Sequence, residues 1–533
     1  MSRIAIILSG RFISPSMQSE LGSLPPVFLS VAGKTLLEHQ VATIEAAGGA
    51  DTILLSLPSS YDPSLWQAEI VDRLGLRVIH TPEAFSIGEA VLFMLAATKN
   101  TSGGLRILYG DTMIAGVDMA EDDLVVVDQP PDAGHWAILS DVETTGRTGR
   151  ETKLVTRFTD DLDQKVMAGY ASFSSIPNLM QAIALEHYDF VAAIGRYDSE
   201  IELTFAPRGT WYDFGRPRTF FESRRDFTTE RHFNNLKISE TTVAKTSAQT
   251  KKVSAEAAWF ESIPPRLRKY TPAFLGRIEE NERGEAGYLL EYLHMLPLND
   301  CFTHFRLPSG SWRDAVQACI AFLAECRQLQ DASVGDPEDL YGKKTYERLA
   351  TFCRQRDIDP DRSWTINGRV VGSFREIVDR ALAKIGPTEM TCIVHGDFCF
   401  SNILFDTRTG RIRVIDPRGA IDIEQPSIMG DPRYDIAKLH HSFSGFYDLI
   451  LAGRGTLQER APYDVLFDVE VTDEQRVVSA MFRDALASEG FADLELVHAI
   501  TVLLFVSMTP LHVDKPERQM HLAMNALRLA LEL

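Results

Sequence analysis

The sequence predicts an α/β first half followed by a two-lobed α+β second half, and three observations lead to this fold class. Short apolar strands alternate with amphipathic helices over roughly the first 125 residues, and a β-rich stretch follows. From about residue 297 the pattern is mostly helical. At 533 residues the chain exceeds a single hydrophobic core. We predict three parts: residues 1–228, 229–296 and 297–533.

The first part alternates between the two kinds of element. Strands are predicted at 4–8, 52–56, 77–80 and 105–109, and helices at 36–47, 65–74 and 87–97. Further strands are predicted at 123–128, 136–139, 153–157 and 166–173. This spacing indicates a Rossmann-like sheet with parallel strands and helices on both faces. Ligands of such sheets gather at the carboxyl ends of the strands, where Gly10 and Asp111 fall.

Composition limits the class of protein. The net charge of −20 argues against nucleic acid as a partner, because phosphate backbones need clustered Lys and Arg. The six cysteines form no C-x-x-C pair, so neither zinc nor a disulfide framework is indicated, and a reducing compartment is expected. The apolar run 499–508 is predicted to be a buried helix too short to span a membrane. We therefore expect a cytoplasmic protein, and the sequence does not indicate its oligomeric state.

The most informative motif lies in the third part, at His395-Gly396-Asp397. Asn402 follows Asp397 by five positions, and Asp416 ends an apolar run. This spacing is found in phosphoryl-transfer loops, where an aspartate meets the acceptor hydroxyl and two oxygen ligands hold Mg²⁺. The flanking runs 391–394 and 403–405 predict a strand–loop–strand hairpin around these groups. The alternative is that Asp397 merely caps a loop through its side chain.

The motif resembles the aminoglycoside phosphotransferase and choline kinase family, which has a protein-kinase-like fold. The resemblance implies that Asp397 orients or deprotonates the acceptor hydroxyl and that Asn402 and Asp416 hold Mg²⁺ on ATP. It also implies a phosphate-binding lysine, which we assign to Lys245 in Val243-Ala244-Lys245, and a partner glutamate, which we assign to Glu256. The alternative is that Lys245 and Glu256 are surface residues.

Other residues of the second half follow from the same resemblance. Residues 288–293 are interpreted as a strand that enters the hinge between the lobes, and we assign Glu291 and Leu293 to nucleotide binding there. Asp431 or Asp435 is expected near the site. Arg418 is interpreted equally as a group that neutralises phosphate or as a partner of a carboxylate.

Two aspartates in the first half suit a second magnesium site. Asp111 follows a predicted strand in Tyr-Gly-Asp, and Asp213 lies in Trp-Tyr-Asp-Phe-Gly. In nucleotidyl transfer a phosphate of one substrate attacks the α-phosphorus of an NTP. Two aspartates hold the metal that bridges the oxygens of both groups. Each aspartate is equally interpreted as the cap of a turn beside its glycine.

The first half resembles the sugar-nucleotide pyrophosphorylases and cytidylyltransferases. Besides the two aspartates, the resemblance rests on the run Val31-Ala32-Gly33-Lys34 and on Ala168-Gly169-Tyr170. It implies a nucleotidyltransferase domain with Asp111 and Asp213 as metal ligands.

The nucleotide-binding loop of this half departs from the family pattern. We assign Gly10 and Gly88 to nucleotide binding, and Arg11 to catalysis as the remaining positive charge of the first loop. Pro25-Pro26 stands where the family has a catalytic lysine.

Together these patterns predict a bifunctional enzyme. The second half would phosphorylate a sugar, polyol or amino alcohol with ATP, and the first would join the product to a nucleotide from CTP, UTP or GTP for surface polysaccharide synthesis. Small molecules and nucleotides would be its partners, and Mg²⁺ its cofactor. The alternative is a kinase with a catalytically degenerate nucleotidyltransferase-like binding domain, and a third reading is a scaffold of two inactive domains.

Overall fold

The computed structural model forms two compact units and describes residues 3–48, 50–98, 103–143, 150–226, 235–331, 341–387, 390–418, 427–490 and 493–533. Unit 1 comprises Met1–Thr228 and His304–Arg306, and unit 2 comprises Thr229–Thr303 and Leu307–Leu533. The predicted boundary between residues 228 and 229 lies outside the described residues. The predicted boundary between residues 296 and 297 lies within unit 2.

Unit 1 is built on a nine-stranded mixed sheet of order β10-β9-β11-β6-β1-β4-β5, with β8 beside β11 and β12 beside β8. Its strands are β1 (Arg3–Leu8), β4 (Thr52–Pro58), β5 (Arg77–Thr81), β6 (Gly104–Tyr109), β8 (Leu124–Asp128), β9 (Gly134–Glu143), β10 (Arg150–Thr159), β11 (Val166–Phe173) and β12 (Thr204–Ala206). β6, β1, β4 and β5 are parallel, whereas β11 is antiparallel to β6. The predicted α/β class with a mixed sheet is confirmed.

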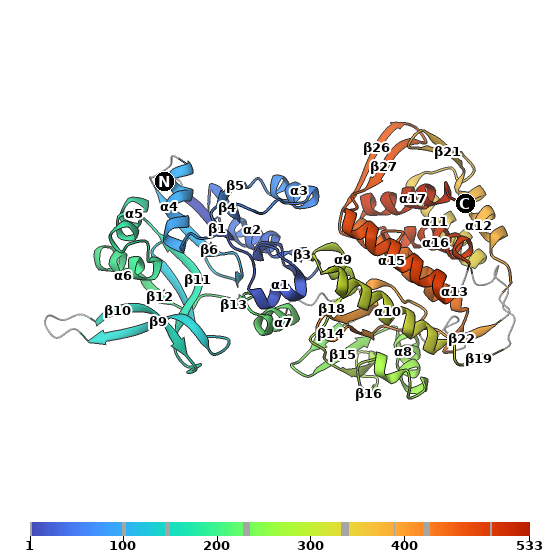
Figure 1. Cartoon of the computed structure of the whole chain (residues 1–533), viewed down its shortest axis with the longest axis horizontal. Helices are drawn as coiled ribbons and strands as arrows, with labels where there is room; N and C mark the ends of the chain where they lie inside the picture. Colours follow the sequence, from blue (N-terminus) through green and yellow to red (C-terminus); the bar gives the residue numbers. More distant parts are fainter. Residues whose placement is uncertain are drawn as a thin grey trace. The chain divides into compact units, whose positions relative to one another are not determined.

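The helices of unit 1 are α1 (Pro15–Leu21), α2 (Leu36–Ala46), α3 (Leu65–Arg73), α4 (Ile87–Thr98), α5 (Ile176–Leu185), α6 (Phe190–Glu200) and α7 (Pro217–Asp226). Helices α1 to α4 return the chain between the parallel strands β1, β4, β5 and β6, because a parallel pair needs a crossover connection. The other three helices follow β11 and β13 (Thr210–Asp213). α2 begins with a capping box between Thr35 and Glu38, which satisfies free backbone amides at the first turn. α4, α5 and α6 share one core with the sheet, formed by residues such as Val91, Ile107 and Ile183 (Figure 1).

Two short ribbons complete unit 1. One pairs β2 (Ser30–Val31) with β3 (Lys34–Thr35), and the other pairs β7 (Thr112–Ala115) with β13 (Thr210–Asp213). The second ribbon joins segments about one hundred residues apart in the sequence, and its register sets Asp213 opposite Thr112. It therefore brings the Tyr-Gly-Asp and Trp-Tyr-Asp motifs together.

Unit 2 begins with a small antiparallel sheet of order β14-β15-β17-β16. Its elements are β14 (Asn235–Ile238), β15 (Thr242–Ser247), α8 (Thr250–Ser262), β16 (Phe274–Ile278) and β17 (Ala286–Glu291). α8 buries Val253, Trp259 and Phe260. These elements lie in the predicted second part, residues 229–296, of which residues 229–234 lie outside the described residues.

The remainder of unit 2 is mainly helical, as predicted. Its helices are α9 (Leu298–Thr303), α10 (Ser309–Cys326), α11 (Lys343–Arg356), α12 (Phe374–Lys384), α13 (Pro432–Phe443), α14 (Tyr447–Leu451), α15 (Asp473–Glu489), α16 (Leu494–Met508) and α17 (Pro516–Ala530). Small sheets have the orders β18-β23-β24 and β19-β22-β25. Their strands are β18 (Leu296–Pro297), β19 (Gln330–Asp331), β22 (Thr391–Ile393), β23 (Ile403–Asp406), β24 (Arg411–Val414) and β25 (Met429–Gly430).

Two features of this helical part differ from the sequence prediction. A four-stranded sheet was not predicted: β21 (Arg369–Gly372), β20 (Trp364–Ile366), β27 (Asp464–Val469) and β26 (Gly455–Ala461). Its two outer pairs are local hairpins, and its central pair, β20 with β27, joins segments about one hundred residues apart. The apolar run 499–508 belongs to a longer apolar helix, Leu494–His512, which by length and composition alone could cross a membrane. Its apolar window is 61% buried within the protein, as in a core helix.

The strand–loop–strand hairpin predicted around His395-Gly396-Asp397, which we call the catalytic motif, is wrong in its pairing. β22 pairs with β19 and β25, whereas β23 pairs with β18 and β24. The loop between β22 and β23 therefore connects two sheets. Asp416 lies two residues beyond the end of β24 instead of ending a strand.

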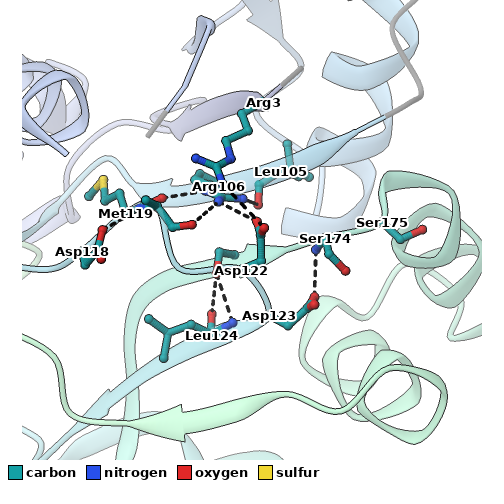
Figure 2. Close-up of polar contacts among 12 residues, drawn as sticks. Arg3, Leu105, Arg106, Asp118, Met119, Asp122, Asp123, Leu124, Ser174 and Ser175 are labelled. Atoms are coloured by element: carbon teal, nitrogen blue, oxygen red, sulfur yellow. Dashed lines mark hydrogen bonds and ion pairs between the residues drawn. The ribbon is translucent and has the colours of Figure 1, made fainter. Parts of the chain in front are cut away.

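A buried arginine ties the parallel part of unit 1 to its neighbouring loop. Arg106 on β6 is 1% exposed, and its Nη2 lies 2.6 Å from Asp122 Oδ1 (Figure 2). Its Nε donates to the carbonyl of Met119 at 2.9 Å, and its Nη2 to that of Ala120 at 3.3 Å. The guanidinium thus provides hydrogen bonds for the backbone carbonyls of Met119 and Ala120, which lie in a loop and have no partner in a neighbouring strand. Such bonds matter because buried polar groups are costly unless they are hydrogen-bonded.

We expect Arg106→Ala to lower the free energy of unfolding of unit 1 by about 3 kcal/mol, because it leaves buried carbonyls without a donor. Arg77→Ala on β5 is a matched control, because the exposed Arg77 also donates to a carbonyl, that of Ala97. Its expected cost is below about 1 kcal/mol. Urea unfolding followed by hydrogen exchange of β6 peptides measures both. Equal costs for the two variants would contradict the role of Arg106.

Candidate active sites

A buried lysine organises the small sheet of unit 2. Lys245 on β15 is 4% exposed, and its Nζ lies 2.7 Å from Glu256 Oε2 and 3.0 Å from Asp416 Oδ1. Tyr288, opposite Lys245 on β17, donates to the same Glu256 oxygen at 3.0 Å. Burial opposes the charge of Lys245, yet the two carboxylates raise its pKa above the usual value. The structure therefore places Lys245 beside Glu256, the partner assigned to it from the sequence, and adds Asp416 to the pair.

The catalytic motif forms a tight loop around Asp397. The amide Nδ2 of Asn402 donates to the Asp397 carbonyl at 2.9 Å and to Asp397 Oδ2 at 3.0 Å. His395 Nε2 donates to the carbonyl of Ile415 at 3.0 Å, and its Nδ1 accepts from the Asp397 amide at 3.3 Å. Burial lowers the pKa of His395 to about 4, so the ring stays neutral and holds the loop against the segment that leads to Asp416.

Helix α13 supplies two residues to this loop. Asp435 accepts the amides of His395 at 2.6 Å and Gly396 at 2.8 Å, which positions the backbone before Asp397. Lys438, one turn further, has its Nζ 2.8 Å from Asp397 Oδ1. Although burial opposes it, Lys438 holds the pKa of Asp397 well below its usual range. Asp397 is therefore ionised and able to accept a proton or orient a hydroxyl.

Sequence reasoning had placed Asp435 near the site without a role and had missed Lys438. The only sequence signal for Lys438 is its spacing of three from Asp435, which puts both on one face of a helix. Asp431 instead accepts from Arg433 and from Tyr341, whose hydroxyl lies 3.0 Å away.

Asp416 has an unusual backbone, with φ of 56°. Non-glycine residues rarely adopt this left-handed region, and such strain clusters at functional sites. The conformation turns the Asp416 carboxylate towards Lys245 instead of continuing β24.

One pocket of about 650 Å³ collects these groups. Its lining includes Lys245, Glu256, Asp397, Asn402 and Asp416.

The two predicted hinge residues do not line this pocket. Glu291 ends β17 and accepts the Ala273 amide at 3.2 Å through Oε2, and Leu293 follows in the connection to β18. Their assignment to nucleotide binding stays a prediction.

Unit 1 has a separate pocket of about 270 Å³ at the carboxyl ends of its parallel strands. Gly10 follows β1, Ser56 lies on β4, Thr81 ends β5 and Asp111 follows β6, and all four line the pocket. This is the position expected for ligands of such sheets. Arg11 lines it too, and its Nη2 donates to the Phe85 carbonyl at 2.8 Å.

Asp111 and Asp213 converge on Gly215. A Cβ atom at Gly215 would lie 2.7 Å from Asp111 Oδ2 and 3.4 Å from Asp213 Oδ1, and the Phe214 amide donates to the Asp111 carbonyl at 2.8 Å. Burial raises the pKa of Asp111, and burial together with Asp111 raises that of Asp213 to about 7. Two buried carboxylates are costly together unless a cation lies between them.

The other predicted residues of unit 1 divide between this pocket and its surroundings. Gly88, in the first turn of α4, packs so closely that a Cβ atom would lie 2.4 Å from the Tyr188 carbonyl oxygen, and it does not line the pocket. Its assignment to nucleotide binding stays a prediction. Pro26, which stands near the expected catalytic lysine position, does line the pocket. Among the pocket-lining residues that the structure describes, Arg11 is the only lysine or arginine.

Both sites have donors suited to Mg²⁺, which prefers carboxylate and amide oxygens. Asp416 and the amide oxygen of Asn402 would hold it in unit 2, and Asp111 and Asp213 in unit 1. Within the described ranges, no group of three or more His, Cys, Asp or Glu forms a ready metal cluster.

Comparison with known proteins bears on both halves. Residues 236–465 match the profile of the Phosphotransferase enzyme family. The chain is also similar to the solved aminoglycoside-3'-phosphotransferase of type VIII, at 14% identity over 52% of this chain and 94% of the other, with a TM-score of 0.30. In its N-terminal part it is similar to the nucleoside-diphosphate-sugar pyrophosphorylase of Vibrio cholerae RC9, at 17% identity over 42% and 99% of the two chains, with a TM-score of 0.31.

A curated relative is the Bifunctional protein GlmU of Xanthobacter autotrophicus, 34% identical over 89 residues. The match covers 17% of this chain and 19% of that protein, so the chain spans about one fifth of its length. Both resemblances that the sequence predicts are therefore met among known proteins, in the family profile for residues 236–465 and in the proteins similar to the N-terminal part.

The buried His395 predicts a pH-dependent stability. Its pKa is about 4 in the folded protein against an ordinary 6.5, so the unfolded chain binds the extra proton as pH falls. The wild-type protein should therefore lose about 2 kcal/mol more unfolding free energy between pH 6.5 and 4.5 than His395→Gln does. Urea unfolding of both proteins at these two pH values gives the difference. Parallel losses in the two proteins would mean that His395 is already protonated in the folded state.

Proposed function

We propose that unit 2 transfers the γ-phosphoryl group of ATP to a hydroxyl of a small molecule. The observation that carries this proposal is the convergence of Asp397, Asn402, Asp416 and Lys245 on one pocket. The acceptor oxygen attacks the γ-phosphorus, the bond to the β-phosphate oxygen breaks, and ADP leaves with that electron pair. Asp397 orients the hydroxyl and takes its proton, which its ionised state allows.

The other groups of this site bind and orient. Lys245, held by Glu256, lies where it can neutralise nucleotide phosphates, and Asn402 and Asp416 would hold Mg²⁺. When bound, Mg²⁺ supplies positive charge to the phosphate oxygens. Lys438 keeps Asp397 ionised and in place, so we assign it as a positioning residue.

For unit 1 we propose nucleotidyl transfer to the phosphorylated product. A phosphate oxygen of that product attacks the α-phosphorus of CTP, UTP or GTP, the bond to the β-phosphate breaks, and pyrophosphate leaves. Asp111 and Asp213 would hold Mg²⁺, and Arg11 would contact the triphosphate. Supporting this, the pocket lies at the carboxyl ends of the parallel strands, beside the buried carboxylate pair.

The two reactions follow each other chemically, because the product of the first is the acceptor of the second. Linking both sites in one chain raises the effective concentration of the intermediate. A nucleotide-activated small molecule is the form used to build surface polysaccharides, and we propose that role in the cytoplasm. All six cysteines are buried free thiols, which agrees with a reducing compartment.

The alternative function, a kinase with a catalytically degenerate nucleotide-binding domain, is favoured by one observation. The unit 1 pocket has Pro26 near the position of the family's lysine and only Arg11 as a described cation. A phosphate clamp of preorganised positive charge is usually a large part of catalysis. Magnesium-dependent pyrophosphate release would reject this alternative.

We expect Asp397→Asn to lower phosphoryl transfer by about a hundredfold or more, because it removes the proton acceptor without changing shape. Nucleotidyl transfer from a supplied phosphomonoester should be unchanged. Phosphorus NMR with ATP, Mg²⁺ and a panel of sugars, polyols and amino alcohols follows both steps. Loss of both activities in this one variant would contradict two separate sites.

The reciprocal variant is Asp213→Asn. It should abolish pyrophosphate release and leave ADP formation unchanged, since it removes a magnesium ligand from unit 1 alone. Asp198→Asn, on α6 away from the pocket, is a charge-matched control. A coupled pyrophosphate assay with each NTP measures the effect and identifies the base. Pyrophosphate release that persists in Asp213→Asn would exclude the proposed metal pair.

A further inference from the structure

Three cations gather in the unit 2 pocket beyond the groups already used. Lys344 and Arg348 lie on α11, and Arg418 lies two residues after Asp416. All three line the pocket together with Asp397. We call them the cation cluster. The Arg418 amide donates to the His395 carbonyl at 2.8 Å, and a Cβ atom at Gly396 would lie 2.7 Å from the Arg418 Cβ. The cluster therefore reaches the catalytic loop.

The charges of the pocket do not balance. Its described lining has three carboxylates, of Glu256, Asp397 and Asp416, and each is within ion-pair distance of Lys245 or Lys438. The three cations of the cluster and Lys252 remain. Within the part of the chain that the structure describes, no carboxylate forms an ion pair with a member of the cluster. This excess of positive charge stands in a protein whose net charge is −20.

The arrangement of the cluster is not one that stability favours. Lys344 and Arg348 are four residues apart on one helix, where like charges repel and destabilise the helix. Arg348 is held in this place, because its Nη1 donates to Ser507 Oγ at 2.9 Å and to the Ser507 carbonyl at 3.1 Å. A ligand of opposite charge would offset the repulsion.

The local electrostatics agree with this geometry. Burial first, and then Arg418, Arg348 and Lys438, lower the pKa of Lys344 to about 8, and the nearby exposed Glu347 offsets this only in part. Burial and Arg418 likewise lower the pKa of Arg348. Arg418 thus disfavours the charged forms of both Lys344 and Arg348 in the absence of an anion.

We propose that the acceptor of the phosphotransferase carries an anionic group, a carboxylate or a phosphate, besides the hydroxyl that is phosphorylated, and that Lys344, Arg348 and Arg418 bind that group. This inference rests on the proposed phosphotransferase function and names its substrate class. Arg and Lys suit both anions, since charge-assisted hydrogen bonds to carboxylate and phosphate are the strong ones. Sugar acids and sugar phosphates fit, whereas amino alcohols and quaternary ammonium compounds do not.

The helical members of the cluster and the proposed nucleotide-binding groups lie on different elements of the same pocket. Lys245 and Glu256 belong to the small sheet and α8, whereas Lys344 and Arg348 belong to α11. The pocket wall beside Arg348 is completed by Leu503, Leu504 and Ser507 of α16. The acceptor is therefore placed between α11, α16 and the catalytic loop.

The first test uses acceptors built on one carbon skeleton: sorbitol, gluconate, sorbitol 6-phosphate and glucamine. With Mg²⁺ and ATP, phosphorus NMR should show phosphorylation of gluconate or sorbitol 6-phosphate at least about tenfold faster than of sorbitol, and none of glucamine. Which of the two anions reacts distinguishes carboxylate from phosphate. Preference for sorbitol or glucamine overturns the inference and leaves the phosphotransferase function intact.

The second test measures anion binding without turnover. Inorganic phosphate and gluconate are titrated by calorimetry into Asp397→Asn saturated with Mg²⁺ and a non-hydrolysable ATP analogue, so that nucleotide groups are occupied. Adding Lys344→Gln or Arg348→Gln should weaken binding by about tenfold to a hundredfold. Lys343→Gln is the matched control, because the exposed Lys343 lies on the same helix and does not line the pocket.

The outcomes of the two tests distinguish a failure of the anionic-acceptor inference from a failure of the proposed phosphotransferase function. Equal anion affinities in the Lys343, Lys344 and Arg348 variants, or no anion binding, overturn the inference. So does a loss of affinity for the ATP analogue in the Lys344 and Arg348 variants, because the cluster would then belong to the nucleotide. Anion binding lost in those two variants supports the inference even if none of the four acceptors reacts. Phosphoryl transfer absent from every small hydroxyl compound would instead reject the proposed function.

Discussion

The ion-pair chain Glu256–Lys245–Asp416 is the interaction on which the active geometry of unit 2 depends. One buried ammonium joins a strand, a helix and the loop after β24. Burying these charges costs several kcal/mol per ion, which only close pairing and hydrogen bonds offset. Tyr288 supplies one such bond to Glu256. The arrangement is therefore better explained by positioning phosphate-binding groups than by stability.

The catalytic loop is held by a second set of contacts that converges from other elements. Asp435 of α13 accepts two loop amides, and Trp259 of α8 donates its Nε1 to the Val394 carbonyl at 2.8 Å. Lys438 then pairs with Asp397 itself. Because the loop connects two sheets instead of closing a hairpin, it has no ladder of its own to hold it. Side chains from two helices replace that ladder, so Asp397, the proposed proton acceptor, is held in place by the protein itself.

The two units handle charge in opposite ways. Unit 1 buries two carboxylates side by side, which raises the pKa of Asp213 to about 7 and favours a cation between them. Unit 2 neutralises its carboxylates with lysines and then adds the cation cluster, which favours an anion. Both imbalances are relieved by a reaction that brings Mg²⁺, nucleotide phosphates and an anionic acceptor to the chain. Charge, more than pocket size, thus distinguishes what each site accepts.

Short-range patterns in the sequence determined the elements and the motif residues. The alternation of strands and helices predicted the parallel strands of unit 1, and the five-residue spacing of Asp397 and Asn402 predicted that both belong to one site, because both patterns depend on neighbours along the chain. Tertiary structure alone decided which strands pair around the loop, that Lys438 meets Asp397, and that Lys344, Arg348 and Arg418 share one pocket. Those contacts join segments tens of residues apart, and no local periodicity records them. The sequence by itself therefore determined which residues carry the proposed phosphoryl transfer, whereas packing decided the electrostatic surroundings of that site.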